Sequence, residues 1–153
     1  MSRAFVKETD ETFDELPDRP ISPNPNIVTA QGLAAIEATL ARLQQEHAVA
    51  QASSDRAVLA ALSREVRYWA SRRASAQVIA TPRNPTKVQF GCTVTILRDD
   101  GCRRTYRIVG EDEADPSRGT ISYVSPVARA LVGKKIGDVV RAGKSDVELV
   151  AIT

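Results

Sequence analysis

The chain has 153 residues and a mass of 16.6 kDa, enough for one or two small domains. Its hydrophobic fraction of 42% and charged fraction of 26% are ordinary for a soluble globular protein. The net charge of +2 gives no argument for whole-molecule binding to nucleic acid or acidic membranes. Neither an apolar run of about 20 residues nor a signal-peptide core is present, so we expect a cytoplasmic chain without membrane contact.

The composition also restricts the chemistry that the chain can perform. One histidine (His47) and two cysteines (Cys92, Cys102) exclude most zinc sites built from protein ligands. They also leave little material for a nucleophile paired with a base. We therefore expect a protein that is not itself an enzyme and that needs neither a metal nor a cofactor.

The first 27 residues differ in composition from the rest. Residues 1–27 carry three basic and six acidic side chains, a net charge of −3, and four of the eight prolines. Such a segment is typical of an extended tail that packs loosely or not at all. The alternative is a docking arm for a partner.

A helical hairpin is predicted for residues 28–80. In residues 29–51 the seam residues are separated alternately by three and four positions, as in a coiled-coil heptad. Thr29 is a plausible N-cap, and Gly32 in the first turn slightly lowers helix propensity. Residues 54–77 repeat this spacing, with Ser53 or Ser54 as the cap. Because few residues join them, the helices should run antiparallel, with arms roughly 30–35 Å long. The seam positions are Leu33, Ile36, Leu40, Leu43, His47 and Ala50, then Leu59, Leu62, Val66, Trp69, Arg73 and Ala76.

A prolyl break at residues 81–85 precedes a domain at residues 85–153 with a different period. Residues 92–96 and 105–108 alternate between apolar and polar, which predicts two strands joined at Asp99-Asp100-Gly101. A three-residue loop pairs Val94 with Tyr106 and Cys92 with Ile108, putting the apolar residues on one face. That register keeps the two cysteines roughly 20 Å apart, so we expect both to be thiols.

The remaining elements complete an α+β domain. Strands are predicted at residues 120–124, 138–141 and 146–152, and a short helix at 125–133. Ser125 would be its N-cap, Pro126 its first helical residue and Gly133 its C-terminal glycine. We expect a small antiparallel sheet covered by one helix.

The sequence resembles the bacterial Gre factors (GreA and GreB) from residue 28 to residue 153. The resemblance is carried by Ile108-Val109-Gly110-Glu111-Asp112-Glu113-Ala114-Asp115, Gly119-Thr120-Ile121-Ser122, Ser125-Pro126, Ala130-Leu131, Gly133-Lys134 and Gly137-Asp138. Val28-Thr29-Ala30-Gln31-Gly32-Leu33 is similar to the start of that family's coiled coil, and Ala76-Gln77-Val78-Ile79 to its end.

The resemblance implies an α-hairpin coiled coil followed by a domain with an FKBP-like fold. It implies that the globular domain docks at the rim of the RNA polymerase secondary channel while the hairpin enters the channel. The resemblance implies docking through Ser125, Pro126 and the start of the helix that follows. Val127 and Arg129 lie close by on the first turn, so we add them as docking candidates, because an apolar ring flanked by a cation is a plausible small anchor. In the family, acidic residues at the hairpin tip help the polymerase hold a second magnesium ion and cleave backtracked RNA.

The hairpin tip departs from the family. The chain has Ala50-Gln51-Ala52-Ser53-Ser54-Asp55 where Gre factors have several acids, and only Asp55 lies at the turn. Each arm looks about nine residues shorter than in the family, which removes roughly 13 Å of reach. Metal coordination needs about 2 Å, so we expect no stimulation of transcript cleavage. Asp55 is retained as a weak metal-directed candidate, against a capping or solvated role.

Two charged clusters are further candidates for contact with a partner, and other functions remain as alternatives. Arg56, Arg64 and Arg67 are candidates for contact with nascent RNA or with the polymerase channel, against a solvated helix face. The acidic turn at residues 111–115 suggests a surface loop or a contact to a basic partner. Alternatives to polymerase binding are a prolyl isomerase or chaperone, and an adaptor for another protein such as a nucleoside diphosphate kinase, whose regulators resemble a Gre factor with a short hairpin.

Overall fold

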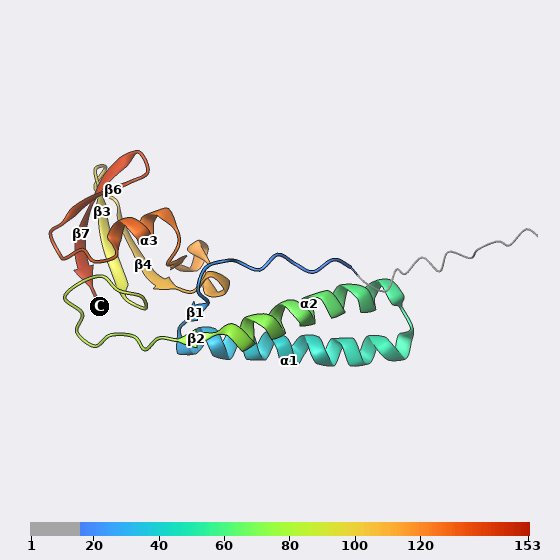
Figure 1. The fold of residues 1–153 in the computed structure, drawn as a ribbon. Helices are drawn as coiled ribbons and strands as arrows, with labels where there is room; N and C mark the ends of the chain where they lie inside the picture. Colours follow the sequence, from blue (N-terminus) through green and yellow to red (C-terminus); the bar gives the residue numbers. More distant parts are fainter. Residues whose placement is uncertain (1–15) are drawn as a thin grey trace, which may run out of the picture.

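The computed structural model describes residues 16–153, in which a long helical hairpin projects from a β domain (Figure 1). Helix α1 spans Ala30–Ser53 and helix α2 spans Arg56–Ser75. Thr29 is the N-cap of α1, and its hydroxyl accepts a hydrogen bond from the Gly32 N–H at 3.0 Å. At 1.5 Å per residue the arms measure about 36 Å and about 30 Å, close to the predicted length.

The start of α2 differs from the prediction. Ser54 adopts a left-handed conformation, with φ of 55°, and Asp55 is the N-cap. The Asp55 carboxylate accepts from the Val58 N–H at 3.2 Å. The prediction of Ser53 or Ser54 as the cap is wrong, because the Ser53 hydroxyl donates to the Ala50 carbonyl within α1.

The hairpin seam is confirmed along α1 and needs correction along α2. In α1 the buried residues include Ile36, Leu40 and Leu43. In α2 the buried residues are Ala60 and Arg72, while the predicted seam residue Arg73 is exposed. Arg73 instead pairs with Glu37 across the hairpin at 3.5 Å. In the last turn of α2 the heptad pattern therefore no longer predicts which residues are buried.

A pair of short parallel strands ties the two ends of the hairpin together. Strand β1 (Ile27–Val28) pairs with β2 (Gln77–Val78). Because these strands hold the entry and exit of the hairpin side by side, the hairpin leaves the β domain as one unit.

The expectation of a loosely packed tail is wrong for its described part. Residues 16–26, which we call the strap, run alongside α2 (Figure 1). Arg19 pairs with Glu65 at 2.7 Å, and Asn26 is 5% exposed. The strap is polar and proline-rich, and side-chain hydrogen bonds hold it. Residues 1–15 of the predicted tail lie outside the described residues.

The β domain is a five-stranded sheet in the order β5-β4-β3-β7-β6. Three of its pairings are antiparallel, but β4 and β5 are parallel, so the predicted antiparallel sheet is mixed. Two 3₁₀ turns between β4 and β5 reverse the chain twice, which accounts for the parallel pairing. The strands are β3 (Thr93–Arg98), β4 (Arg103–Val109), β5 (Thr120–Ser122), β6 (Val139–Ala142) and β7 (Ser145–Ile152), and the 3₁₀ turns are η1 (Glu111–Glu113) and η2 (Pro116–Arg118).

The predicted register of the β3–β4 hairpin is confirmed. Val94 pairs with Tyr106, and the Ile108 N–H donates to the Cys92 carbonyl at 2.9 Å. Gly101 has φ of 81°, the left-handed conformation that its turn requires. Both cysteines are free thiols, Cys92 buried and Cys102 exposed.

Helix α3 (Pro126–Leu131) packs on the sheet and closes the core. Ser125 is its N-cap as predicted, and its hydroxyl accepts from the Ala128 N–H at 3.3 Å. The core residues are Val88, Val94, Ile96, Ile108, Ile121, Ala128, Leu131, Val140, Val147 and Leu149. The α+β class, a hairpin followed by a β domain with a short helix, is confirmed.

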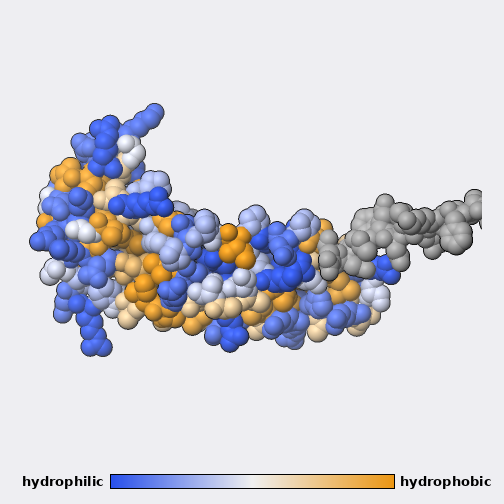
Figure 2. Space-filling view, viewed as in Figure 1, coloured by the Kyte–Doolittle hydropathy of each residue, from blue (hydrophilic) through white to orange (hydrophobic). Residues whose placement is uncertain are grey.

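Within residues 16–153 no helix combines the length and the apolar character needed to cross a bilayer. On the face drawn in Figure 2, apolar residues are interspersed among hydrophilic ones over both the hairpin and the β domain.

Candidate functional site

The hairpin tip presents a single carboxylate at the turn. Asp55 is exposed, but its oxygen is engaged as the cap of α2. The nearest other acid along α1, Glu46, is paired with Arg42 at 2.8 Å. In the part of the chain that the structure describes, histidine, cysteine and acidic side chains do not form a group of three that could hold a metal. The tip therefore has the geometry of a helix cap.

The predicted docking residues lie together at the start of α3. Pro126 and Arg129 are exposed, and Val127 is half-buried against the core. Proline has no N–H, so Pro126 exposes an apolar ring without an unmet donor. Val132, just after α3, is 48% exposed, which extends the apolar surface beyond the predicted residues.

An open cleft adjoins this docking face. Phe90 and Tyr123 line it in an edge-to-face arrangement, with ring centroids 5.9 Å apart, and Arg129 and Val132 form its rim. The Tyr123 hydroxyl donates to the carbonyl of Pro25, which brings the strap into the cleft wall. Burial raises the pKa of the Tyr123 phenol, so the hydroxyl remains a donor further into alkaline pH than an exposed tyrosine.

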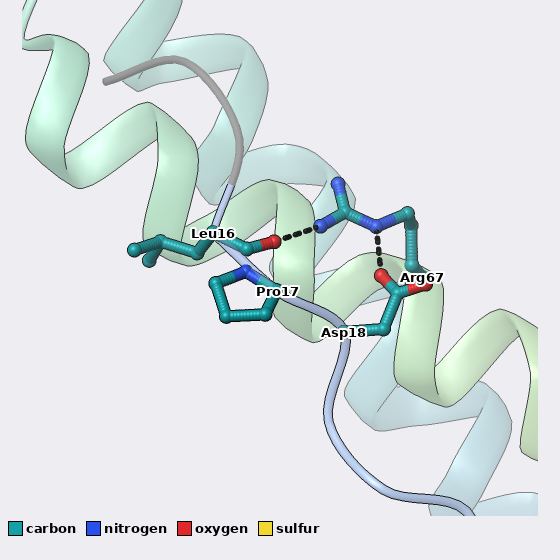
Figure 3. Close-up of a pocket in the computed structure, with 4 residues that line it drawn as sticks. All are labelled: Leu16, Pro17, Asp18 and Arg67. Atoms are coloured by element: carbon teal, nitrogen blue, oxygen red, sulfur yellow. Dashed lines mark hydrogen bonds and ion pairs between the residues drawn. The ribbon is translucent and has the colours of Figure 1, made fainter. Parts of the chain in front are cut away.

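The predicted basic candidates have different environments along α2. Arg56 is exposed in the first turn, and Arg64 is half-buried, with no hydrogen-bond partner for its Nε among the described residues. Arg67 reaches from α2 to the strap (Figure 3). Its Nε donates to the Asp18 carboxylate at 2.6 Å and its terminal nitrogen to the Leu16 carbonyl at 3.0 Å. Arg56 is thus open, whereas Arg67 is engaged by the strap.

The base of the hairpin is held by an arginine that the sequence pattern did not single out as buried. Arg72 is 2% exposed and donates from Nε to Asp112 at 2.6 Å. Its terminal nitrogen donates to Asn26 at 2.9 Å, while the Asn26 amide donates to the Arg72 carbonyl at 2.7 Å. A buried guanidinium needs such partners because desolvating an unpaired charge costs several kcal/mol, about 3–5 in measured cases.

The acidic turn at residues 111–115 supplies the other half of this junction. Tyr68 donates its hydroxyl to Asp112 at 2.7 Å, and burial together with this hydrogen bond raises the pKa of Tyr68 to about 12. Glu111 accepts from Ser22 at 3.0 Å. The acidic turn therefore contacts a basic residue of its own chain, Arg72, whereas the sequence suggested a surface loop or a contact to a basic partner.

Glu113 fixes the start of α1 against the turn. Its carboxylate accepts from the N–H groups of Thr29 and Gly110, each at 3.0 Å, and from the Thr29 hydroxyl. A Cβ at Gly32 would lie 2.0 Å from the Glu113 carboxyl carbon. Gly32 is therefore needed for close approach, and its place inside a helical first turn was the sequence signal for this contact.

Comparison with known proteins assigns the chain to the class of transcription elongation factors. The family model described as "Transcription elongation factor, GreA/GreB, C-term" matches residues 83–153. The transcription elongation factor GreA of Methylobacterium sp. (strain 4-46) is 36% identical over 149 residues, covering 82% of this chain and 94% of the relative. The GreB of Haemophilus influenzae is 36% identical over 135 residues, covering 76% and 85%. The chain belongs to the GreA/GreB family of transcription elongation factors.

A solved structure, that of the GreA factor homolog 1 (Gfh1) of Thermus thermophilus, matches 83% of this chain and 97% of its own. The two are 22% identical, and the TM-score is 0.41.

Proposed function

We propose that this chain binds RNA polymerase at the rim of the secondary channel, places its hairpin in the channel, and regulates elongation without stimulating transcript cleavage. In this proposal the chain is not itself an enzyme. Membership of the Gre family supports polymerase as the partner. The docking face is built from Ser125, Pro126, Val127 and Arg129, with Val132 beside them.

The observation that carries the absence of cleavage is the hairpin tip. Phosphodiester cleavage with two metal ions needs carboxylate oxygens free to coordinate the second ion. At the tip, Asp55 is the one carboxylate at the turn, with one oxygen accepting from the Val58 N–H, and Glu46 is paired with Arg42. A single capping carboxylate is a poor metal ligand set. In this proposal the chain therefore acts on elongation by occupying the channel.

The test is transcript cleavage in backtracked elongation complexes with purified core polymerase. Wild-type protein should give the rate of polymerase alone. Asp55→Asn is the informative variant because asparagine keeps the helix cap while removing the negative charge. Asp99→Asn, an exposed acid in the β3–β4 turn, is the matched control. Cleavage stimulated by the wild-type chain would overturn this part of the proposal. If that stimulation persists in Asp99→Asn but is lost in Asp55→Asn, the Asp55 carboxylate is its source.

A contact between α2 and nucleic acid is the second part of the proposal. Helix α2 carries Arg56, Arg64, Arg67, Arg72 and Arg73 against the single acid Glu65, a net charge of +4. Phosphates bind such a face by charge attraction and counterion release. Arg72 is buried in the junction and is not available for this contact. The residues we assign to it are Arg56, Arg64 and Arg67, of which Arg67 is also paired with Asp18 of the strap.

A further inference from the structure

The strap covers the part of α2 that is best suited to single-stranded nucleic acid. Proteins that bind single strands combine cations for the phosphates with aromatic rings on which bases stack. Arg67 and its neighbour Tyr68 supply one of each. The Tyr68 ring is fixed in place because its hydroxyl is bound to Asp112.

Two consecutive strap residues contact the Arg67 guanidinium and the Tyr68 ring. The Asp18 carboxylate lies on Arg67, 2.6 Å from Nε, where a phosphate would bind. The planar guanidinium of Arg19 lies over the Tyr68 ring, 3.8 Å from its centroid, where a base would stack. The Leu16 carbonyl takes a second nitrogen of Arg67. Asp18 thus occupies the place of a nucleotide phosphate, and the guanidinium of Arg19 occupies the place of its base.

We propose that the strap is a built-in competitor for this site: Asp18 and Arg19 mask Arg67 and Tyr68, and single-stranded nucleic acid must displace them to bind α2. The inference rests on the proposed nucleic-acid contact of α2, but not on polymerase binding. The proposal assigns the strap a regulatory role in nucleic-acid binding.

The contacts of the mask are of a kind that a ligand can displace. The side chain of Asp18 is 75% exposed and that of Arg67 is 42% exposed. Exposed ion pairs are weak and are screened by salt, and exposed cation–π pairs are of similar strength. A strand offering several phosphates therefore competes effectively, whereas a single anion does not.

Charge attraction favours retention of the mask in the absence of ligand. Residues 8–15, which directly precede the strap in the sequence, contain five acidic residues and no basic one. Helix α2 has a net charge of +4. Opposite charges attract, and the attraction weakens as ionic strength rises, so low salt should favour the masked state.

The test is binding of a fluorescein-labelled 12-mer of uridine, measured by fluorescence anisotropy at low salt without polymerase. The informative variant is the swap Asp18→Arg with Arg19→Asp, which leaves composition and net charge unchanged. It places a cation against Arg67 and a carboxylate over the Tyr68 ring, so both mask contacts become unfavourable. It also breaks the pair of Arg19 with Glu65, which further loosens the strap. The matched control is Arg98→Asp with Asp99→Arg, the same exchange at two exposed residues of the β3–β4 hairpin.

We expect the strap swap to tighten binding by about fivefold to tenfold, the scale of two exposed contacts. The control swap should match wild type, and adding Arg67→Ala to the strap swap should abolish the gain. Equal affinity of wild type and strap swap would overturn the mask while leaving the α2 contact in place. A gain that survives Arg67→Ala, or appears in the control swap, would also overturn it. Absence of binding by every variant would overturn both the mask and the α2 contact.

Discussion

Arg72 of α2 and Asp112 of the acidic turn form an ion pair at 2.6 Å, with side chains only 2% and 8% exposed. The pair joins the hairpin to the β domain, and Asn26 of the strap completes it from a third segment. Three segments far apart in the sequence therefore meet at one guanidinium, which sets the direction in which the hairpin leaves the β domain.

Removal of either partner of this pair should destabilise the protein strongly. Arg72→Ala leaves Asp112 without its cation, and Asp112→Ala leaves the buried guanidinium with only the longer ion pair to Glu111 at 4.0 Å. Each should lower the free energy of unfolding by about 3–5 kcal/mol. Arg73→Ala is the control, because its pair with Glu37 is exposed, and it should cost about 0–1 kcal/mol. Urea unfolding measures all three, and equal small losses would show that the junction does not depend on Arg72.

Gly32→Ala should destabilise the protein, although helix propensity alone predicts a gain of about 1 kcal/mol. The new methyl group would push the Glu113 carboxylate away from Thr29 and Gly110. Loss of these hydrogen bonds should cost about 1–3 kcal/mol. In a Glu113→Ala background the clash is gone, so the same change should be neutral or stabilising there. A stabilising Gly32→Ala in the wild-type background would contradict the contact.

Tyr68 should give the protein an alkaline transition. Its pKa is raised from 10.0 to about 12, so the folded chain keeps a proton that the unfolded chain releases. The stabilisation from this group is complete below about pH 10 and is lost as the pH rises toward 12. In a tyrosinate absorbance titration, Tyr68→Phe should remove a late-ionising phenol, one of the three in the chain. Removal of a phenol that ionises near pH 10 would contradict the assigned environment.

Local patterns in the sequence predicted most of the elements. The heptad spacing indicated both helices, and the loop Asp99-Asp100-Gly101 led to the register that pairs Val94 with Tyr106. Ser125 and Pro126 marked the start of α3. These signals work because they depend on neighbours within one turn or one strand pair.

The features that sequence reasoning missed are all long-range. Periodicity assigned Arg73 to the seam and gave no role to Arg72, because nothing local distinguishes two adjacent arginines. The partner of Arg72 is 40 residues away. Likewise the β1–β2 pairing and the Asp18–Arg67 contact join segments about 50 residues apart. A strand of two residues is too short to show a period.

The candidate site was predicted in part. The residues around Pro126 were found through the family resemblance, and the structure adds the cleft of Phe90 and Tyr123 beside them. Asp55 was weighed as a cap, and the structure places it there. The covering of Arg67 by the strap could not be predicted, because composition alone does not show which face an acidic segment meets.

The most direct test of the account is co-sedimentation with core RNA polymerase of the wild-type chain, Pro126→Asp and the control Pro116→Asp. Both prolines are exposed and start a helical turn, where aspartate is well tolerated, so melting curves should be unchanged. We predict that wild type and Pro116→Asp bind and that Pro126→Asp binds about tenfold more weakly or worse. Absence of wild-type binding would contradict polymerase as the partner, and equal binding of all three folded proteins would contradict the docking face at Pro126.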